Sequence, residues 1–360
     1  MKYVVDISQK NAEKIENLIN KGDYDNFTQF VNTAIQNQIY LEETDSSAFE
    51  DEYGFKTRSI TDNSSGIKMV FNNYNIKRIE NHPKPVSMPT FQQVYSTFQN
   101  KEEDHIWLWG QVNRLLPIKI GLRVLYVLLA NANQQIDFQT DGQWINLETY
   151  KEEASKVAAW FGDEIRKYEN TRNKLRDGRI SAGLPKTREF KSKMRYKAHF
   201  LASMRGNNTL DGAMCFLRFI NLSGDVKEMK GNIMIGLTGP GANFAKLVNP
   251  VIDNNNFDQS LSDGERTFYL EHVRTHVKGE SSAIKWLLNT LARGITGREA
   301  INKELKKELG EIWGNPSDQV INTQRAGLMS RMLELGLSER EKKGIKVSYS
   351  VSDKGKNFIM

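Results

Sequence analysis

A strong local excess of positive charge lies between residues 166 and 197. This window contains 12 Lys and Arg and 3 Asp and Glu, a local charge of +9, whereas the whole chain carries +6. Concentrated positive charge attracts polyanions, and contacts of Lys and Arg with phosphate position a protein on nucleic acid without reading bases. The alternative is a solvated, charge-rich helical face. We expect DNA contacts from Arg172, Lys174, Arg176, Arg179, Lys186, Arg188, Lys191 and Arg195.

A second cluster has the side chains needed to read bases. A helix is expected to begin at Ser317, after Asn315 and Pro316, and to expose polar side chains in its first turns. The amides of Asn and Gln can pair with adenine, and Arg can pair with guanine. A basic hairpin is expected to follow, and a polar surface for protein contacts is the alternative. We expect DNA contacts from Gln319, Asn322, Thr323, Arg325, Lys342, Lys343 and Lys346.

Two histidines have the spacing of metal ligands. His272 and His276 are four residues apart, which places both rings on one face of a helix. The residues between them are Val, Arg and Thr, so the glutamate of the HExxH zinc motif is missing, and no third ligand is visible. We therefore expect surface or interface histidines and no metal site.

The remaining motifs do not indicate catalysis. Gly236, Gly239 and Gly241 follow the order G-x-x-G-x-G, which matches neither a phosphate loop nor a dinucleotide fingerprint. Cys215, the one cysteine, lies in an apolar stretch that favours a buried packing role. We expect no catalytic residue and no cofactor. A nuclease-type subunit is the alternative, although no D-x-D, E-x-K or HNH-like cluster supports it.

The elements that must position these side chains begin with a small N-terminal unit. Residues 2–7 alternate as a strand does, and apolar spacing predicts helices at residues 8–20 and 25–41. One strand and two short helices bury too little surface to fold alone, and the strand has no partner in the segment. Two chains that pair their strands would solve both problems, so we expect a homodimer.

This order resembles the ribbon-helix-helix family of prokaryotic DNA-binding proteins, most closely in GDYDNFTQFVNTAI at residues 22–35. In that family the paired strands enter the major groove, and the start of the second helix holds a phosphate. Asp6 departs from the pattern because a carboxylate repels phosphates, and residues 1–55 carry a charge of −7. The unit could therefore serve mainly as a dimer clasp. The resemblance implies DNA contacts from Lys2, Val4, Asp6, Asn26 and Thr28.

The remainder of the chain is expected to be mainly helical. Residues 282–360, with three helices followed by a hairpin, resemble the winged-helix superfamily, and residues 104–254 resemble it more loosely. This resemblance implies a fold that commonly binds DNA. A long helix is expected to include residues 154–161. The other expected helices are at residues 118–132, 190–204, 210–221, 262–278, 282–293, 297–310 and 317–336. A short strand is expected near residues 179–185. One hairpin is expected at residues 226–237, and the return strand of a second hairpin is expected at residues 345–351.

These elements predict a mainly α fold with small β, an N-terminal ribbon-helix-helix followed by tandem winged-helix-like domains. A linker or irregular arm is expected at residues 45–103. The domains are expected at residues 1–44, 104–185, 186–255 (degenerate) and 256–360. No run of about 18 apolar residues could span a membrane, and no apolar segment follows the charged N-terminus as in a signal peptide. Since a single cysteine also excludes a disulfide framework, we expect a cytoplasmic protein.

Together the patterns predict a homodimeric protein that binds double-stranded DNA, namely a transcriptional regulator of a prokaryote or a mobile element. Self-association is expected through the N-terminal strand, and no membrane partner is expected. The alternative is a replication-initiation, plasmid-partition or phage-defence adaptor protein that binds DNA without regulating transcription.

Overall fold

The computed structural model describes residues 9–20, 27–28, 73–95, 102–132, 142–172, 179–205, 208–224, 233–343 and 346–359. The chain divides into two compact units, residues 1–64 and 65–360. The described elements are mainly helical with small sheets, which confirms the predicted mainly α fold with small β. None of the described helices is long and apolar enough to cross a membrane.

In the first unit, the structure describes helix α1 (Gln9–Asn20) and residues 27–28, which are helical. α1 matches the helix predicted at residues 8–20, and it buries Ile15. Thr28 is exposed. The predicted strand at residues 2–7, with Lys2, Val4 and Asp6, lies outside the described residues, as does Asn26. The ribbon-helix-helix arrangement and the strand-paired dimer therefore stay predictions.

In the second unit, residues 73–95 form an irregular arm that packs against the helices. The arm contains η1 (Ile76–Arg78) and α4 (Phe91–Tyr95). Its Val86 is buried and forms a parallel bridge to Thr238. This part of the predicted linker or arm is therefore held by tertiary contacts, with little regular structure of its own.

The first group of regular elements surrounds α5 (Leu116–Asn131). Apart from Lys119 and Arg123, this helix is apolar, and it is almost entirely buried, as expected of a central helix. β1, β5 and β4 form an antiparallel sheet in that order. The elements around α5 are η3 (Glu103–His105), β1 (Ile145–Asn146), α6 (Leu147–Thr171), α7 (Phe190–Tyr196), η5 (Lys197–Leu201), β2 (Ser203–Met204), β3 (Leu210–Asp211), α8 (Ala213–Phe216), β4 (Ile220–Ser223), β5 (Met234–Leu237), α9 (Gly239–Lys246), α10 (Pro250–Asn254) and α11 (Asp263–His276).

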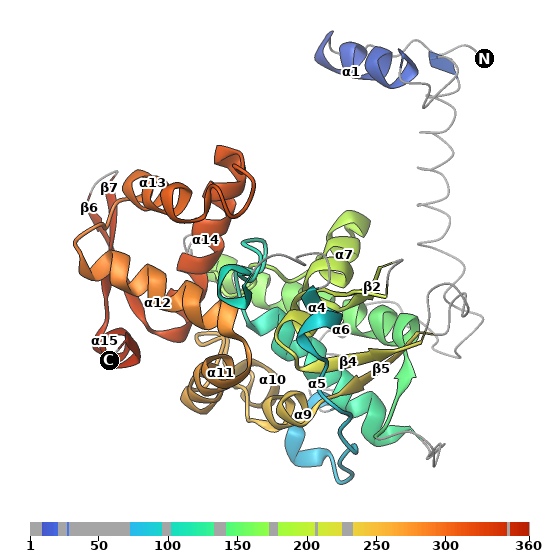
Figure 1. The fold of residues 1–360 in the computed structure, drawn as a ribbon. Helices are drawn as coiled ribbons and strands as arrows, with labels where there is room; N and C mark the ends of the chain where they lie inside the picture. The colour runs from blue at the N-terminus through green and yellow to red at the C-terminus, as the bar shows by residue number, and fades with distance from the viewer. Residues whose placement is uncertain are drawn as a thin grey trace. The chain divides into compact units, whose positions relative to one another are not determined.

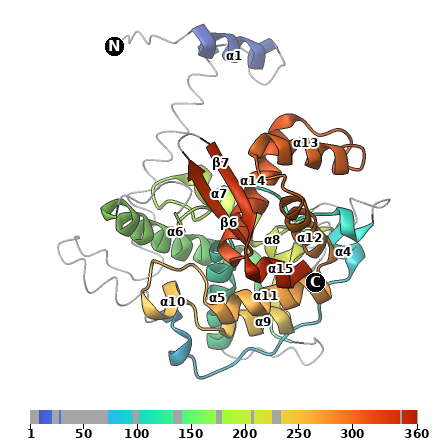
Figure 2. The ribbon, with the colours of Figure 1, turned by 90° about the vertical axis from the view of Figure 1, so that its left-hand side faces the viewer.

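A second group of elements, orange and red in Figure 1, follows at the C-terminal end. It contains α12 (Lys278–Ala292), α13 (Arg298–Leu309), α14 (Asp318–Leu335), β6 (Ser338–Lys343), β7 (Lys346–Val351) and α15 (Asp353–Ile359). The antiparallel hairpin of β6 and β7, with Ser338 opposite Val351, faces the viewer in Figure 2. The three helices and the hairpin occur in the predicted order.

The two groups repeat one order of elements. In the first group, β1 precedes α6 and pairs with β5, the returning strand of the β4–β5 hairpin. In the second group, Gly297 precedes α13 and forms an antiparallel bridge to Ser348 on β7, the returning strand of the β6–β7 hairpin. Because β1 lies at residues 145–146 and β5 at 234–237, the segments predicted as domains 104–185 and 186–255 share one sheet.

Each hairpin begins after a residue in the left-handed conformation that ends the preceding helix. Arg218 follows α8 with φ of 55°, and Gly336 follows α14 with φ of 73°. The next residues, Phe219 and Leu337, each donate their backbone N–H to a carbonyl five residues earlier. This is a common way to satisfy the last carbonyls of a helix.

Each hairpin ends at a hydroxyl that caps the next helix. Thr238 Oγ1 accepts from Gly241 N at 3.2 Å, and Ser352 Oγ accepts from Gly355 N at 3.0 Å. Each hydroxyl also donates to the carbonyl of the left-handed residue before its hairpin. A Cβ at Gly241 or Gly355 would lie 1.8 or 2.1 Å from a backbone oxygen, so glycine is needed at both positions. The same backbone arrangement therefore occurs twice in this unit.

Four predicted elements differ from the structure. The hairpin predicted at residues 226–237 has its first strand earlier, as β4 at residues 220–223. The helix predicted at residues 210–221 is β3, α8 and β4, because positive φ values at Gly212 and Arg218 interrupt it. The helix predicted at residues 190–204 ends with the π-turn η5, and residues 203–204 are in β2. The strand predicted near residues 179–185 is a series of turns. There the buried Glu169 accepts hydrogen bonds from the backbone N–H and the hydroxyl of Ser181, at 3.1 and 2.6 Å.

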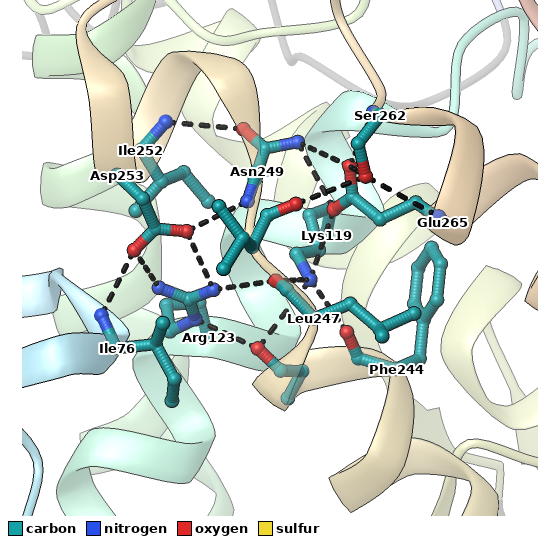
Figure 3. A network of polar contacts seen from close by, with 12 residues as sticks. Ile76, Lys119, Arg123, Phe244, Leu247, Asn249, Ile252, Asp253, Ser262 and Glu265 are labelled. Carbon is teal, nitrogen blue, oxygen red and sulfur yellow. Dashed lines mark hydrogen bonds and ion pairs between the residues drawn. The ribbon is translucent and has the colours of Figure 1, made fainter.

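α5 carries two buried cations one helical turn apart (Figure 3). Lys119 Nζ lies 2.9 Å from a carboxylate oxygen of Glu265, and Arg123 lies 2.7 Å from one of Asp253. Both cations also donate to backbone carbonyls at the C-terminal end of α9. The last carbonyls of a helix carry the negative end of its dipole and are left largely to partners outside the helix. The Phe244 carbonyl also accepts from the backbone N–H of Leu247 at 3.3 Å. The network therefore compensates the buried charges and fixes α9 on α5.

Candidate nucleic-acid interface

A polar groove of about 960 Å³ lies between α7 and α14. It brings together residues from both predicted DNA-binding clusters, although the clusters are more than 100 residues apart in the sequence. One wall includes Arg195, and the other includes Gln319, Asn322, Thr323 and Arg325. None of the described residues that line the groove is Asp or Glu. A groove with arginines and no carboxylates favours an anionic ligand.

Tyr196 positions the wall formed by α7. Its hydroxyl is buried and donates to the carbonyl of Pro117 at 2.8 Å, and its ring stacks on Phe200 with 5.7 Å between the centroids. These contacts attach α7 and η5 to the start of α5. The neighbouring side chain of Arg195 and that of His199 remain exposed beside the groove. A rigid aromatic anchor thus holds a cation at the solvent surface.

Asn302 of α13 positions the wall formed by α14. Its Oδ1 accepts from Nε of Arg325 at 2.8 Å, and its Nδ2 donates to Oδ1 of Asn322 at 2.6 Å. Two predicted base-contacting side chains are therefore held by one amide. Asn302 was not predicted as a site residue, because nothing in the local sequence pattern relates residue 302 to residues 322 and 325.

The opposite face of α14 is locked against the segment before α5. Gln324 donates from Nε2 to the carbonyl of Leu108 and accepts from the backbone N–H of Gly110, both at 2.8 Å. Further along the same stripe, a Cβ on Gly327 would lie 2.0 Å from the carbonyl oxygen of Gly110. This backbone contact needs glycine on both sides. It joins the two groups of elements beside the groove.

A buried ion pair extends this attachment. Arg331 of α14 binds Glu280 of α12 at 2.9 Å, with neither side chain exposed, and Arg331 also donates to the carbonyl of Val112 at 2.5 Å. Burial raises the pKa of Glu280, and the Arg331 guanidinium opposes that change. One turn later, Glu334 accepts from the backbone N–H of Leu115 at 2.6 Å. α14 is therefore a rigid element, so the side chains on its groove face keep fixed positions.

Several predicted phosphate-binding residues do not line the groove. Arg172 lies 3.6 Å from Asp258 and stacks over the ring of Tyr168. Lys186 pairs with Glu189 at 2.7 Å. Arg188, Lys191 and Lys342 are exposed elsewhere, and Arg179 is half-buried. Lys343 and Lys346 are placed by their backbone alone, in β6 and β7, and Lys174 and Arg176 lie outside the described residues.

The groove also contains a buried polar atom that the sequence pattern does not predict. Oδ1 of Asn113 is buried and has no hydrogen-bond partner. A buried acceptor without a partner is costly, and a ligand or water that donates to it would remove that cost. Asn113 is thus a further contact point for a ligand with N–H or O–H groups.

The surface or interface position expected for both histidines is wrong for His272, which is buried, whereas His276 is half-buried. His272 is buried, its Nε2 lies 2.7 Å from the carbonyl of Leu217, and its ring stacks on Phe219. Burial lowers the pKa of His272 to about 4, so the ring is neutral at pH 7. In the described part of the chain, no group of three or more His, Cys, Asp or Glu could hold a metal ion.

Cys215 and the glycines of the G-x-x-G-x-G segment have structural positions. Cys215 is fully buried, and burial raises the pKa of its thiol, which opposes thiolate chemistry. Gly239 and Gly241 form the first turn of α9, where Thr238 supplies the cap. This is a strand-to-helix turn.

No family model, curated protein or solved structure matches this chain. Function must therefore be inferred from the groove and from the elements that build it.

Proposed function

We propose that this chain is a DNA-binding protein that contacts duplex DNA with α7 and α14. The observation that supports this most strongly is the shared groove, in which Arg195 from one helix faces Gln319, Asn322 and Arg325 from the other. Side chains suited to phosphate and side chains suited to base edges thus line one surface that has no Asp or Glu among its described residues.

The repeated order of elements supports the same proposal. In both groups a helix and a short strand segment precede further helices and a hairpin whose returning strand contacts that segment, an order that is compatible with the winged-helix domains we propose. In such folds, the helix before the hairpin enters the major groove. α14 has this position directly before β6, whereas in the first group α7 and η5 precede β4 with β2, β3 and the short helix α8 between them. We propose that α7 and α14 are both recognition helices.

The fixed position of α14 supports the proposal that the protein recognises a base sequence in addition to binding the DNA phosphates. Base discrimination requires side chains that hold their geometry, since a misplaced donor loses its hydrogen bond. Asn302 orients Arg325 and Asn322 from one side, and Gln324 fixes the helix from the other. Preorganised side chains of this kind lose little entropy when they bind.

We assign the protein the role of a transcriptional regulator that acts as a dimer, with the N-terminal unit as the clasp. Mapping the occupied sites in the source genome tests this role. A few promoter sites would support it. Occupancy of one origin or one array of repeats would instead support a replication or partition protein.

Duplex binding itself is tested by selection from a random duplex library, followed by fluorescence anisotropy at about 100 mM salt. We expect one enriched sequence and a log–log salt slope near −5 if about six phosphates are contacted. Arg325→Ala should reduce affinity for that sequence by about tenfold or more. The control is Arg293→Ala, an exposed arginine on the C-terminal side of α12 that does not line the groove. Failure to enrich any duplex would refute the proposal.

A further inference from the structure

A second hollow, of about 430 Å³, lies against a different face of α14. Val320 and Gln324 contribute to it, whereas Gln319, Asn322 and Thr323 face the groove. Its walls are mostly apolar and contain Trp107, Trp109, Trp313 and Phe216. We refer to it as the tryptophan pocket. Its volume lies in the range of pockets that hold small molecules.

Two indole nitrogens, one amide and one ion pair at the tryptophan pocket already have partners. The ring nitrogens of Trp107 and Trp313 each donate to a backbone carbonyl, at 2.9 and 3.0 Å. The side-chain amide of Gln324 donates to the carbonyl of Leu108 and accepts from the backbone N–H of Gly110. Apart from His105, the charged residues among the described lining are Arg205 and Asp211, which pair with each other at 2.6 Å. A charged ligand would therefore lose hydration without gaining a free partner of opposite charge.

The rings in the tryptophan pocket are arranged to receive another aromatic group. Trp107 is buried and fixed edge-on to Trp313, with 5.8 Å between centroids and 86° between planes. Trp109 is 52% exposed at the pocket, and Val320 is 42% exposed. Large apolar side chains that remain in water gain free energy when a ligand covers them. Aromatic ligands gain further from offset or edge-on contact with these rings.

We propose that the tryptophan pocket binds an uncharged small molecule that carries aromatic rings. The pocket is preformed, because Gln324 and the Gly110–Gly327 contact hold its walls together. It does not overlap the groove. Ligand binding in the tryptophan pocket can therefore be tested separately from DNA binding.

Two probes that differ in one charged group test the proposal on the full-length protein without DNA. N-phenyl-1-naphthylamine is uncharged, and 8-anilino-1-naphthalenesulfonate adds a sulfonate to the same ring system. We expect the uncharged probe to bind with one-to-one stoichiometry and to receive excitation energy from tryptophan. The sulfonate should bind at least about tenfold more weakly, because its charge finds no partner.

A matched pair of substitutions locates the probe. Val320→Trp should fill the tryptophan pocket and weaken binding by about tenfold or more. Val248→Trp is the control, because Val248 is equally exposed at 42% and lies between α9 and α10. Trp109→Ala provides a second test should Val320→Trp fail to fold, and it should also weaken binding. Equal affinity for both probes, or unchanged binding in the pocket variant that folds, would overturn the proposal.

Discussion

Asn302 on α13 accepts a hydrogen bond from Nε of Arg325 on α14 at 2.8 Å, and the same amide donates to Asn322. Since Nε is occupied, the terminal nitrogens of Arg325 are left to act as the donors toward a ligand. The orientation of the two α14 side chains therefore depends on a helix that does not itself carry the predicted base contacts.

Replacing Asn302 with alanine should reduce sequence discrimination more than general affinity. We expect the preference for the selected duplex over a random one to fall by about tenfold, because Arg325 and Asn322 lose their orientation. Competition anisotropy measures this preference directly. Asn289→Ala, at an exposed position on α12, should leave it unchanged. An equal loss on both duplexes would contradict a positioning role.

Arg195 and Arg172 should differ in their effect on salt dependence. Arg195 lines the groove, whereas Arg172 is paired with Asp258 and stacked on Tyr168. Arg195→Gln should make the log–log salt slope less steep by about 1, the value expected for one lost phosphate contact. Arg172→Gln should change the slope by much less. The opposite ranking would place the phosphate path away from the groove.

Gly327→Ala should destabilise the protein although alanine is the better helix former. The added Cβ would lie 2.0 Å from the carbonyl oxygen of Gly110, so the backbone of one segment must move. We expect a loss of about 2 kcal/mol in the free energy of unfolding. Gly264→Ala on α11, an exposed site with open space around it, should instead stabilise by about 0.5–1 kcal/mol. Urea unfolding of both variants measures the difference, and equal signs would refute the close contact.

His272 should make the fold sensitive to mild acid. Burial holds the pKa of His272 at about 4, whereas the unfolded residue titrates near 6.5. The unfolded chain therefore binds the extra proton first, and stability falls as the pH drops from about 6.5 toward 4. At pH 5 this loss should amount to about 2 kcal/mol.

His272→Gln isolates this contribution, because its amide can still donate to the Leu217 carbonyl and does not titrate. The loss of stability between pH 7 and pH 5 should be smaller by about 2 kcal/mol in this variant. His276→Gln, whose ring lies 5.2 Å away and is only half-buried, should keep the wild-type loss. Identical pH profiles in all three proteins would show that the buried imidazole does not control acid stability.

Most long helices were predictable because their signals are local. Apolar spacing located α5, α6, α11, α13 and α14. The capping box of α11, formed by Ser262 and Glu265, is likewise a local feature, because its two residues are three apart in the sequence. The prediction of a helix at residues 210–221 was wrong for a physical reason. Its apolar residues fit a helix, but left-handed turns at Gly212 and Arg218 redirect the backbone so that the same side chains enter the core from α8 and β4.

The sequence by itself determined the kinds of side chain available for binding DNA, because composition and helical periodicity place Arg195 and Asn322 on exposed helix surfaces. Only the tertiary structure decided that these helices share one groove. That arrangement depends on Gly110 meeting Gln324 and Gly327, which are more than 200 residues away along the chain. Contacts of this kind need matching shapes on two segments, and neither segment alone carries a periodic signal for them. The tryptophan pocket arises from the same packing and is invisible in the sequence for the same reason.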